Sequence, residues 1–379
     1  MTADSFELGP IRPPSEAYSL LIRATKNCPW NRCKFCHIYK GQKFELRPVE
    51  EIKQDILAAK AIQDGLKEMA RKSDYGGSLE AVVMAVLQNP PSQAYFNVAL
   101  WLYHGGTGAF LQDANTLIMP TPDLVEIIKF LKKTLPTITQ VTSYARSKTA
   151  AKKKPAELKA LHEAGLSRLH IGLESGYDLL LEYMDKGVTA AEHIKGGRKI
   201  VASGISLCEY VVLGLGGKKM WREHAVETAK VLNQIDPAFI RVRTLTTKEG
   251  MPLYEEVRNG TFVRASDEEI VEEEKLLIEN LDCHAYFVSD HITNLLQELE
   301  GKLPDDKDKM LAAISRFLSL SPGERHNFRV GRRVGIYNEL NDMADSQKHE
   351  LAERAIEKLS DDGKKVSDEM IYFLMERFI

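Results

Sequence analysis

Between residues 109 and 242 the sequence alternates short apolar runs with stretches of helical periodicity. With one earlier run, these make six expected strands: Tyr18–Ala24, Ala109–Gln112, Ile138–Ser143, Leu169–Gly172, Ile205–Leu213 and Phe239–Val242. Strands separated by helices form parallel sheets with right-handed crossovers. The pattern therefore predicts an α/β fold, but by itself it does not separate a partial (β/α) barrel from a doubly wound sheet.

The segments around this core are expected to be helical. A helical insertion is predicted at about residues 73–107, where the pattern of Leu79–Leu102 is interrupted at Pro90–Pro91. From Asp267 onward we find no convincing strand, and four helices are predicted: Glu268–Asn280, Asp290–Leu299, Lys307–Leu318 and Ser346–Leu359. We therefore expect a core domain over residues 16–260 and a helical C-terminal region over 261–379.

Composition excludes some classes of function. The chain has 379 residues, 44% hydrophobic and 28% charged, as expected of a soluble globular protein with a full core. A net charge of −3 argues against a general polyanion binder. No apolar run is long enough for a membrane span, and the segment Met1–Pro14 lacks the layout of a signal peptide. We therefore expect a cytoplasmic protein.

Three of the five cysteines, Cys28, Cys33 and Cys36, fall within nine residues in the pattern C-x4-C-x2-C. Such clustering is wrong for a disulfide framework and indicates a metal or redox site. Three thiolates can hold three irons of a cubane cluster and leave the fourth iron open, whereas closed clusters normally use four cysteines. The alternative is a structural zinc site completed by His37, although adjacent residues seldom point at one ion.

The segment Thr25–Tyr39 resembles the radical S-adenosylmethionine (SAM) superfamily, in which closely spaced cysteines follow the first strand with an aromatic residue, here Phe35, between the last two. The usual spacing there is C-x3-C-x2-C, and the extra residue here resembles an elongator-like and coproporphyrinogen-oxidase-like subset. The resemblance implies a partial (β/α)6 TIM-like barrel, a [4Fe–4S] cluster on the three cysteines, and SAM bound across the C-terminal strand ends. It also places Phe35 and His37 beside the cofactor.

Other strand ends resemble the remaining motifs of that superfamily. His170–Gly176 reads HIGLESG, which is similar to a family run whose glutamate, here Glu174, contacts the ribose of SAM. The resemblance further implies cofactor contacts at three strand ends and one glycine-rich turn, from Asp113, Ala114, Asn115, Ser143, Arg146, Gly214, Leu215 and Arg243. For Asp113 and Asn115 an ordinary strand-to-helix turn is the alternative, and for Gly214 an ordinary tight turn.

The resemblance implies that the reduced cluster cleaves SAM to a 5′-deoxyadenosyl radical, which takes hydrogen from a substrate. A flavodoxin or ferredoxin-type electron donor is implied as a partner. In the C-terminal region, Asp290 and His291 are candidate catalytic residues, or else a helix cap and a partly exposed histidine. The acidic run Asp267–Glu274 is expected to be a solvated helix face, and so are the arginines at 325, 329, 332 and 333, for which binding of a carboxylate or phosphate is the alternative.

Three functions remain open from the sequence. The leading one is a radical SAM enzyme acting on a small anionic or porphyrin-like molecule, because the charge and the missing RNA-binding appendage disfavour nucleic acid. The second is radical SAM modification of RNA. The third is a non-catalytic protein in which the cysteines hold zinc.

Overall fold

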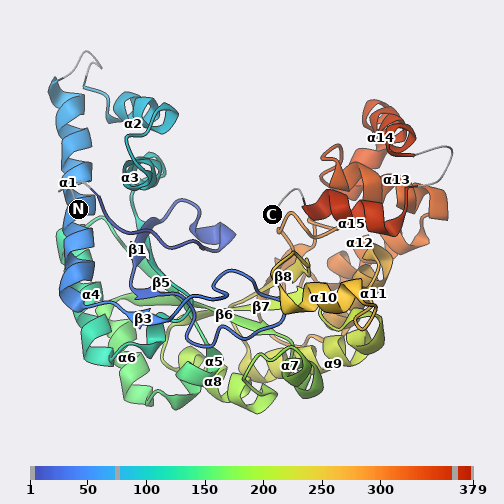
Figure 1. The fold of residues 1–379 in the computed structure, drawn as a ribbon, viewed down its shortest axis with the longest axis horizontal. Helices are drawn as coiled ribbons and strands as arrows, with labels where there is room; N and C mark the ends of the chain where they lie inside the picture. Colours follow the sequence, from blue (N-terminus) through green and yellow to red (C-terminus); the bar gives the residue numbers. More distant parts are fainter. Residues whose placement is uncertain (1–4, 73–76, 361–365, 377–379) are drawn as a thin grey trace. The chain divides into compact units, whose positions relative to one another are not determined.

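A computed structural model of the chain describes residues 5–72, 77–360 and 366–376 (Figure 1). The chain divides into two compact units. The first comprises Met1–Asn31, Ile38–Ile171 and Lys195–Leu207, and the second comprises Arg32–His37, Gly172–Ile194 and Cys208–Ile379. The cysteine segment is therefore shared, with Cys28 in the first unit and Cys33 and Cys36 in the second.

The main sheet has eight strands in the order β1-β4-β5-β6-β7-β8-β9-β10. Their bounds are β1 Leu20–Arg23, β4 Gly108–Gln112, β5 Gln140–Ala145, β6 Leu166–Glu174, β7 Ser206–Leu213, β8 Phe239–Thr244, β9 Tyr286–Val288 and β10 Glu300–Lys302. The pairs β1–β4, β4–β5, β5–β6, β7–β8 and β8–β9 are parallel, and β9–β10 is antiparallel. The six expected strands are β1 and β4 to β8, so the predicted α/β fold with a mostly parallel sheet is confirmed.

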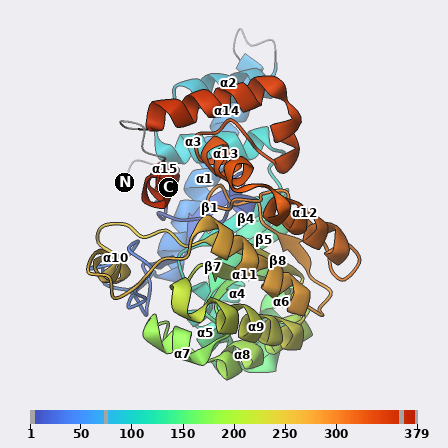
Figure 2. The ribbon, with the colours of Figure 1, turned by 90° about the vertical axis from the view of Figure 1, so that its right-hand side faces the viewer.

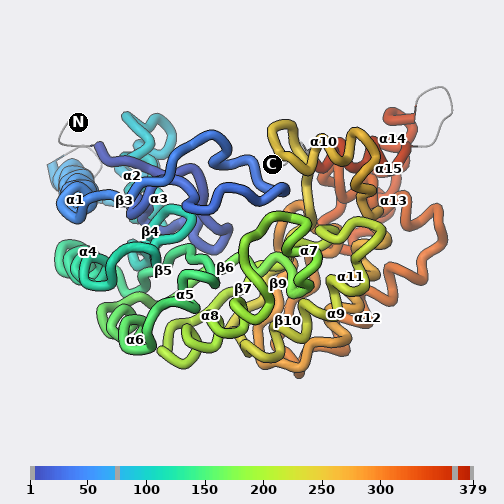
Figure 3. Tube along the Cα trace, turned by 60° about the horizontal axis from the view of Figure 1, so that its bottom comes forward, coloured from blue at the N-terminus to red at the C-terminus, as the bar shows by residue number. Residues whose placement is uncertain are grey.

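Helices of the first unit cover the sheet through apolar faces. Their bounds are α1 Val49–Lys72, α2 Leu79–Gln88, α3 Gln93–Tyr103, α4 Thr121–Thr134, α5 Ser147–Lys152 and α6 Pro155–Ala164. In α1 the buried Ile52, Ile56 and Ala59 recur at helical spacing and form one face. The helix packs against α4 (Figure 1), and α4 packs against α6 (Figure 3).

The insertion after α1 is helical, as predicted. Helix α2 is capped by Ser78, whose Oγ accepts a hydrogen bond from Ala81 N at 3.2 Å, and α3 is capped in the same way by Ser92. The buried Asn97 of α3 bonds the backbone of the edge strand β1, accepting from Leu21 N at 3.0 Å and donating to Ser19 O at 3.2 Å. An otherwise open sheet edge is thus satisfied by a side chain. Residues 73–76, where we expect the insertion to begin, lie outside the described residues.

The second unit holds the later strands and the C-terminal helices. Its helices are α7 Asp178–Tyr183, α9 Gly217–Ile235, α10 Pro252–Arg258, α11 Asp267–Asn280, α12 Lys307–Ser319, α13 Pro322–Arg333, α14 Ser346–Leu359 and α15 Asp368–Glu376, while α8, Ala190–Ala202, begins in this unit and ends in the first. Helix α9 packs on α11, and α13 contacts both α14 and α15 (Figure 2). Within the ranges described above, no helix has the length and apolar character needed to cross a membrane.

Two expectations for the C-terminal region are wrong. The region contains the short strands β9 and β10, and Asp290–Leu299 is an irregular loop rather than a helix. The apolar spacing in this loop is real, because Leu295, Leu296 and Leu299 are all buried. The backbone is held by Asn294, whose side chain donates to Val242 O at 2.9 Å and accepts from Thr244 N at 2.8 Å. These bonds to β8 replace the helical ones.

The two charged runs of this region are partly buried, which corrects the expectation of solvated faces. Asp267 accepts hydrogen bonds from Arg333 at 2.6 Å and Arg329 at 3.2 Å. Burial opposes ionisation of Asp267, but these two arginines outweigh it and lower its pKa. Arg332 and Arg333 also donate to backbone carbonyls of the loop that follows β9, at Asn294, Leu295 and Thr293. Helix α13 therefore clamps the loop that carries His291.

Replacing Asp267 by asparagine tests this clamp. The Asp267→Asn variant leaves the buried guanidinium of Arg333 without its counter-ion and Arg329 with Asp368 alone. We therefore expect the free energy of unfolding to fall by about 3 kcal/mol. Urea unfolding followed by circular dichroism measures the change. The matched control is Glu272→Gln on the exposed side of the same helix, which is expected to be neutral. Equal effects of the two substitutions would contradict a buried ionic clamp.

Candidate active site

In the first unit the cysteine loop begins with Cys28 and is bracketed by the small sheet of β2, Thr25–Lys26, and β3, Glu45–Leu46. Asn31 N–H donates to Cys28 Sγ at 3.4 Å, a contact that stabilises a thiolate. The backbone of Asn31 is left-handed, with φ of 50°, a conformation that asparagine tolerates better than most residues. Its side chain donates to the carbonyls of Tyr39 and Gln42, so the loop folds back on itself.

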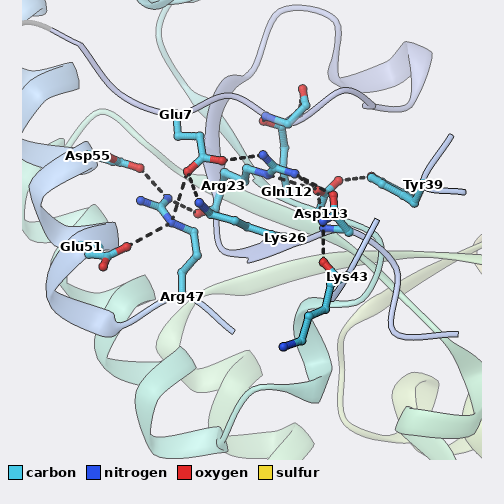
Figure 4. A network of polar contacts seen from close by, with 12 residues as sticks. Glu7, Arg23, Lys26, Tyr39, Lys43, Arg47, Glu51, Asp55, Gln112 and Asp113 are labelled. Carbon is cyan, nitrogen blue, oxygen red and sulfur yellow. Dashed lines mark hydrogen bonds and ion pairs between the residues drawn. The ribbon is translucent and has the colours of Figure 1, made fainter. Parts of the chain in front are cut away.

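Asp113, at the end of β4, is fully buried and holds the loop at both ends (Figure 4). Its carboxylate accepts from Arg23 Nη2 at 2.9 Å, from Asn27 N at 3.1 Å and from the hydroxyl of Tyr39. Burial and the Asp113 charge raise the pKa of Tyr39 far above its usual value, which keeps its hydroxyl a donor. All these donors belong to the chain, so Asp113 acts as a clamp on the loop, and its contact with the cofactor stays a prediction.

A second layer of charges fixes Arg23 itself (Figure 4). Glu7 forms ion pairs with Arg23 at 2.6 Å and Lys26 at 2.9 Å. The buried Arg47 pairs with Asp55 at 2.6 Å and donates to Arg23 O at 2.6 Å. The end of β1 is therefore held rigidly where the cysteine loop begins.

The other polar residues predicted in the first unit are also engaged internally. Asn115 accepts from Arg146 N at 3.0 Å and donates to Thr149 Oγ1 at 2.9 Å, while Ser143 donates to Leu111 O at 2.7 Å. Asn115 and Ser143 are buried and Ala114 is half-buried. The guanidinium of Arg146 lies 5.5 Å from the ring of Trp30, within the cysteine loop. The structure thus gives Asn115 and Ser143 positioning roles at the strand ends.

In the second unit, residues 32–37 carry Cys33 and Cys36 and are anchored by backbone bonds. Lys34 N donates to Met184 O, and Leu253 N donates to Lys34 O, both at 3.0 Å. Between the two cysteines, Cys36 N donates to Cys33 O at 3.3 Å, which makes a tight turn. The ring of Phe35 packs on an apolar cluster that includes Leu215, Val212 and Met184. Phe35 and Leu215, both predicted to contact the cofactor, therefore anchor the cysteine turn in this apolar cluster.

Lys186 lies beside these motifs, although no sequence motif marks it as functional. Its Nζ is 2.9 Å from Glu174 Oε1 and 5.7 Å from the centre of the Phe35 ring. Glu174 has a left-handed backbone, with φ of 63°, and its carboxylate folds back over Gly172. A Cβ on Gly172 would lie 2.1 Å from Glu174 Oε1, so this close approach requires glycine.

A second carboxyl group, that of Glu209 on β7, is completely buried near the pair of Lys186 and Glu174. Within the described residues neither of its oxygens has a hydrogen-bond partner. Burial raises its pKa well above the usual value, with Lys186 and Glu174 acting as smaller, opposed influences. Burial therefore favours the neutral form of Glu209, and Lys186 pairs with Glu174 instead.

A buried His–Glu pair joins the Glu-Ser-Gly run to the turn at Gly214. Glu273 of α11 accepts from Gly214 N at 3.0 Å, and His224 lies 2.9 Å from Ser175 Oγ and 3.3 Å from Glu273. Burial lowers the pKa of His224 to about 4 and raises that of Glu273 well above its usual value, so burial favours the neutral form of each. The acidic run that contains Glu273 gave no sign of this role, which only tertiary contacts reveal.

The two candidate catalytic residues of the C-terminal region have different settings. Asp290 forms a bidentate ion pair with Arg241 of β8, at 2.8 and 2.9 Å. The half-buried His291 accepts at Nδ1 from Thr293 N at 3.3 Å and contacts Thr293 Oγ1 at 2.6 Å. Burial and the charge of Arg243 lower its pKa to about 4, against a smaller opposing effect of Asp290. His291 is therefore a neutral imidazole with its proton on Nε2.

Arg243 and His37 complete the second-unit part of the site. Arg243 is half-buried on β8. The exposed His37, beside Cys36, has a lowered pKa, caused first by partial burial, then by the charge of Lys248 and then by that of Arg243. Across the part of the chain that the structure covers, the guanidinium of Arg243 makes no hydrogen bond or ion pair. This differs from Arg241, which Asp290 neutralises.

Within the described residues no cysteine forms a disulfide, and thiolates are suitable ligands for an iron–sulfur cluster. No group of three or more His, Cys, Asp or Glu side chains converges as a metal site among residues 5–72, 77–360 and 366–376. Cys28 and Cys36 are half-buried, Cys33 is buried, and backbone N–H groups of the loop face sulfur or turn carbonyls. These features fit a cluster, but the set of three ligands remains a prediction from the motif.

Comparison with protein families decides the class of the domain. Residues 98–230 match the sequence model of the radical SAM superfamily. These residues form a radical SAM domain. They include Glu174 and the Gly214 turn, whereas the three cysteines precede the match. Proteins of this superfamily use a [4Fe–4S] cluster and SAM.

Individual relatives of the radical SAM domain are distant. An uncharacterised protein of Methanocaldococcus jannaschii is 30% identical over 100 residues, which are 26% of this chain and 30% of that protein. Methylornithine synthase, PylB, has a TM-score of 0.43 at 16% identity, covering 81% of this chain and 85% of its own. Methanocaldococcus infernus Elp3 with an N-terminal deletion has a TM-score of 0.40 at 14% identity, covering 48% of this chain and 46% of its own. The chain thus spans less than half of the first relatives it matches.

Removing the Asp113 carboxylate is expected to loosen the cysteine loop. The Asp113→Ala variant loses charge-assisted hydrogen bonds worth about 1.5–3 kcal/mol, so amide hydrogen exchange of residues 27–31 should accelerate roughly 10- to 100-fold. Exchange is read by mass spectrometry of peptides from this loop. Asp64→Ala, at an exposed position of α1, is the control and should leave the loop unchanged. Unchanged exchange in Asp113→Ala would remove the clamp from this account.

Proposed function

We propose that this chain is a radical SAM enzyme acting on a small anionic substrate, with its cluster on Cys28, Cys33 and Cys36. The observation that carries the proposal is the radical SAM domain at residues 98–230, preceded after β1 by three cysteines in one loop. The cluster motif and the domain are independent signals in adjacent segments of the chain. Together they favour this reading over a structural zinc site.

The three thiolates would hold the cluster, and the N–H of Asn31 would stabilise the thiolate of Cys28. When bound, such a cluster would supply the electron needed to cleave SAM to methionine and a 5′-deoxyadenosyl radical, the species that would take hydrogen from the substrate. The protein's part is to position cofactor and substrate and to exclude competing reactions. The backbone anchors of Lys34 perform this positioning at the cysteine turn, through Met184 and Leu253.

Glu174 is proposed to bind the ribose of SAM. Lys186 is bonded to Oε1 of its carboxylate, and no other bond to that carboxylate occurs in the described residues, so Oε2 is left to accept from a hydroxyl. A carboxylate in this largely buried setting needs such partners. The ion pair with Lys186 holds the side chain of Glu174 in the folded-back conformation.

The turn at Gly214 and Leu215 is proposed to pack against the adenine. Glu273 fixes the turn through Gly214 N, and His224 fixes Ser175 next to Glu174. Both contacts are buried, so they support the turn from within the core of this unit. The ribose and adenine sites would thus be held in one geometry by a single network.

The remaining parts of the proposal are the substrate and the electron donor. Cationic side chains on β8 favour an anionic substrate, and the net charge of −3 disfavours a long polyanion such as RNA. A flavodoxin or ferredoxin-type protein is the proposed source of the electron. RNA modification and a zinc protein are the alternatives that the following experiments would reveal.

Production of 5′-deoxyadenosine is the direct test. The anaerobically reconstituted protein, reduced with dithionite in the presence of SAM, should form 5′-deoxyadenosine, measured by liquid chromatography. Cys33→Ala should form none, because it removes one proposed cluster ligand. Cys283→Ala should stay active, because the buried Cys283 is not a proposed ligand. Equal activity of Cys33→Ala and wild type would refute the ligand assignment.

Replacing Glu174 by glutamine tests the ribose contact. The loss of one charge-assisted hydrogen bond is expected to raise the KM for SAM about 10- to 100-fold while leaving iron content unchanged. The control is Glu182→Gln on α7, which is exposed. If KM is unchanged and only the melting temperature falls, Glu174 is a structural partner of Lys186 alone.

A further inference from the structure

Arg243, on the sheet of the second unit, has no acidic hydrogen-bond or ion-pair partner among the described residues. Arg241 and Arg243 are alternate residues of β8 and therefore lie on the same face, in register with Tyr210 and Val212 of β7. Asp290 is bonded by both its oxygens to Arg241. Arg243 is half-buried, and nothing in the described residues bonds its guanidinium. A partly desolvated cation of this kind needs an anion.

A second donor is held near Arg243 by the C-terminal region. Thr293 N–H occupies Nδ1 of His291, so the neutral ring presents Nε2–H as a donor. The carbonyl of Thr293 is fixed by Arg333 at 2.7 Å, which sets the orientation of the ring from α13. The bonds of Asp290 to Arg241 and of Asn294 to Thr244 N lay the segment that carries His291 along the end of β8, the stretch that also carries Arg243. The contribution of Arg243 to the lowered pKa of His291 agrees with this placement. Asp290, the acidic residue next to His291, is already bonded to Arg241.

We propose that Arg243 and His291 Nε2–H together bind an acidic group of the substrate, a carboxylate or a phosphate. This inference rests on the proposed function, because it presumes a substrate beside the cysteine loop. Arginine suits the role, since its planar fork matches carboxylate and phosphate oxygens. A neutral imidazole adds a hydrogen bond without repelling Arg243. The site explains what α13 contributes to catalysis: it positions His291 through Thr293.

The carboxylate of SAM itself is the competing source of such an anion. The two sources are separated by chemical labelling of the reconstituted enzyme with phenylglyoxal, which modifies accessible arginines, followed by peptide mass spectrometry. Labelling is carried out with no ligand, with SAM, and with decarboxylated SAM. If the site serves the substrate, Arg243 stays reactive with SAM bound. Protection by SAM but not by decarboxylated SAM would assign Arg243 to the cofactor and overturn the proposal.

Anion binding is then tested with succinate and with inorganic pyrophosphate in the presence of SAM. At least one of them should slow labelling of Arg243 relative to sodium chloride of equal ionic strength, with Arg258 on the surface as an internal control. The His291→Ala variant should weaken this protection about tenfold, as expected for the loss of one hydrogen bond to a charged group. The matched control is Ile292→Ala, at the exposed neighbouring position, which should leave the protection unchanged.

The outcomes are distinct from those of the proposed function. If neither anion protects Arg243, or if Arg243 is never labelled, there is no open anion site. If protection depends on His291 but the same preparation forms no 5′-deoxyadenosine, the anion site stands and the proposed reaction fails. Protection by pyrophosphate alone would assign a phosphate, and protection by succinate alone a carboxylate.

Discussion

The candidate site of the first unit depends on the hydrogen bonds that the buried carboxylate of Asp113 accepts. It bonds Arg23 and Asn27 before the cysteines and Tyr39 after them, so one side chain closes the loop. A buried charge is tolerated only when its hydrogen-bonding capacity is used, and here every donor is supplied by the chain. In the second unit the turn of Cys33 and Cys36 is anchored separately, through the backbone of Lys34.

The same principle recurs in the second unit, with helices supplying the buried polar groups. Glu273 and His224 hold the motif loops around Gly214 and Ser175, and Asp267 holds the arginines of α13. Burial shifts the pKa values of Glu273 and His224 towards their neutral forms, whereas Arg333 and Arg329 lower the pKa of Asp267 despite its burial. Nearby cations thus favour the charged form of Asp267, and burial alone favours the neutral form of Glu273.

The sequence was sufficient for the parts of the fold that repeat. Strands β1 and β4 to β8 follow from apolar runs separated by helical periodicity, and so does the helical insertion of α2 and α3. Strands β9 and β10 have three residues each, too few for a pattern, and their pairing joins residues distant in sequence. The loop Asp290–Leu299 has helical spacing of leucines, but the bonds of Asn294 to β8 override it.

The cysteine motif and Glu174 could be read from the sequence because their residue types and spacing are unusual. Lys186 and Glu273 could not, since a single lysine or one glutamate in an acidic run carries no signal until its partners are known. The arginines of α13 were misjudged for the same reason: helical periodicity says which residues share a face, but not that Asp267 and the carbonyls after β9 lie against it.

The central claim is that the three cysteines hold an iron–sulfur cluster to which SAM binds. Its most direct test is metal and sulfide analysis of the anaerobically purified protein, combined with electron paramagnetic resonance of the reduced form with and without SAM. The account predicts iron and acid-labile sulfide in equal amounts, lost in Cys28→Ala, and a cluster signal that shifts when SAM is added. Stoichiometric zinc without iron or sulfide would contradict it.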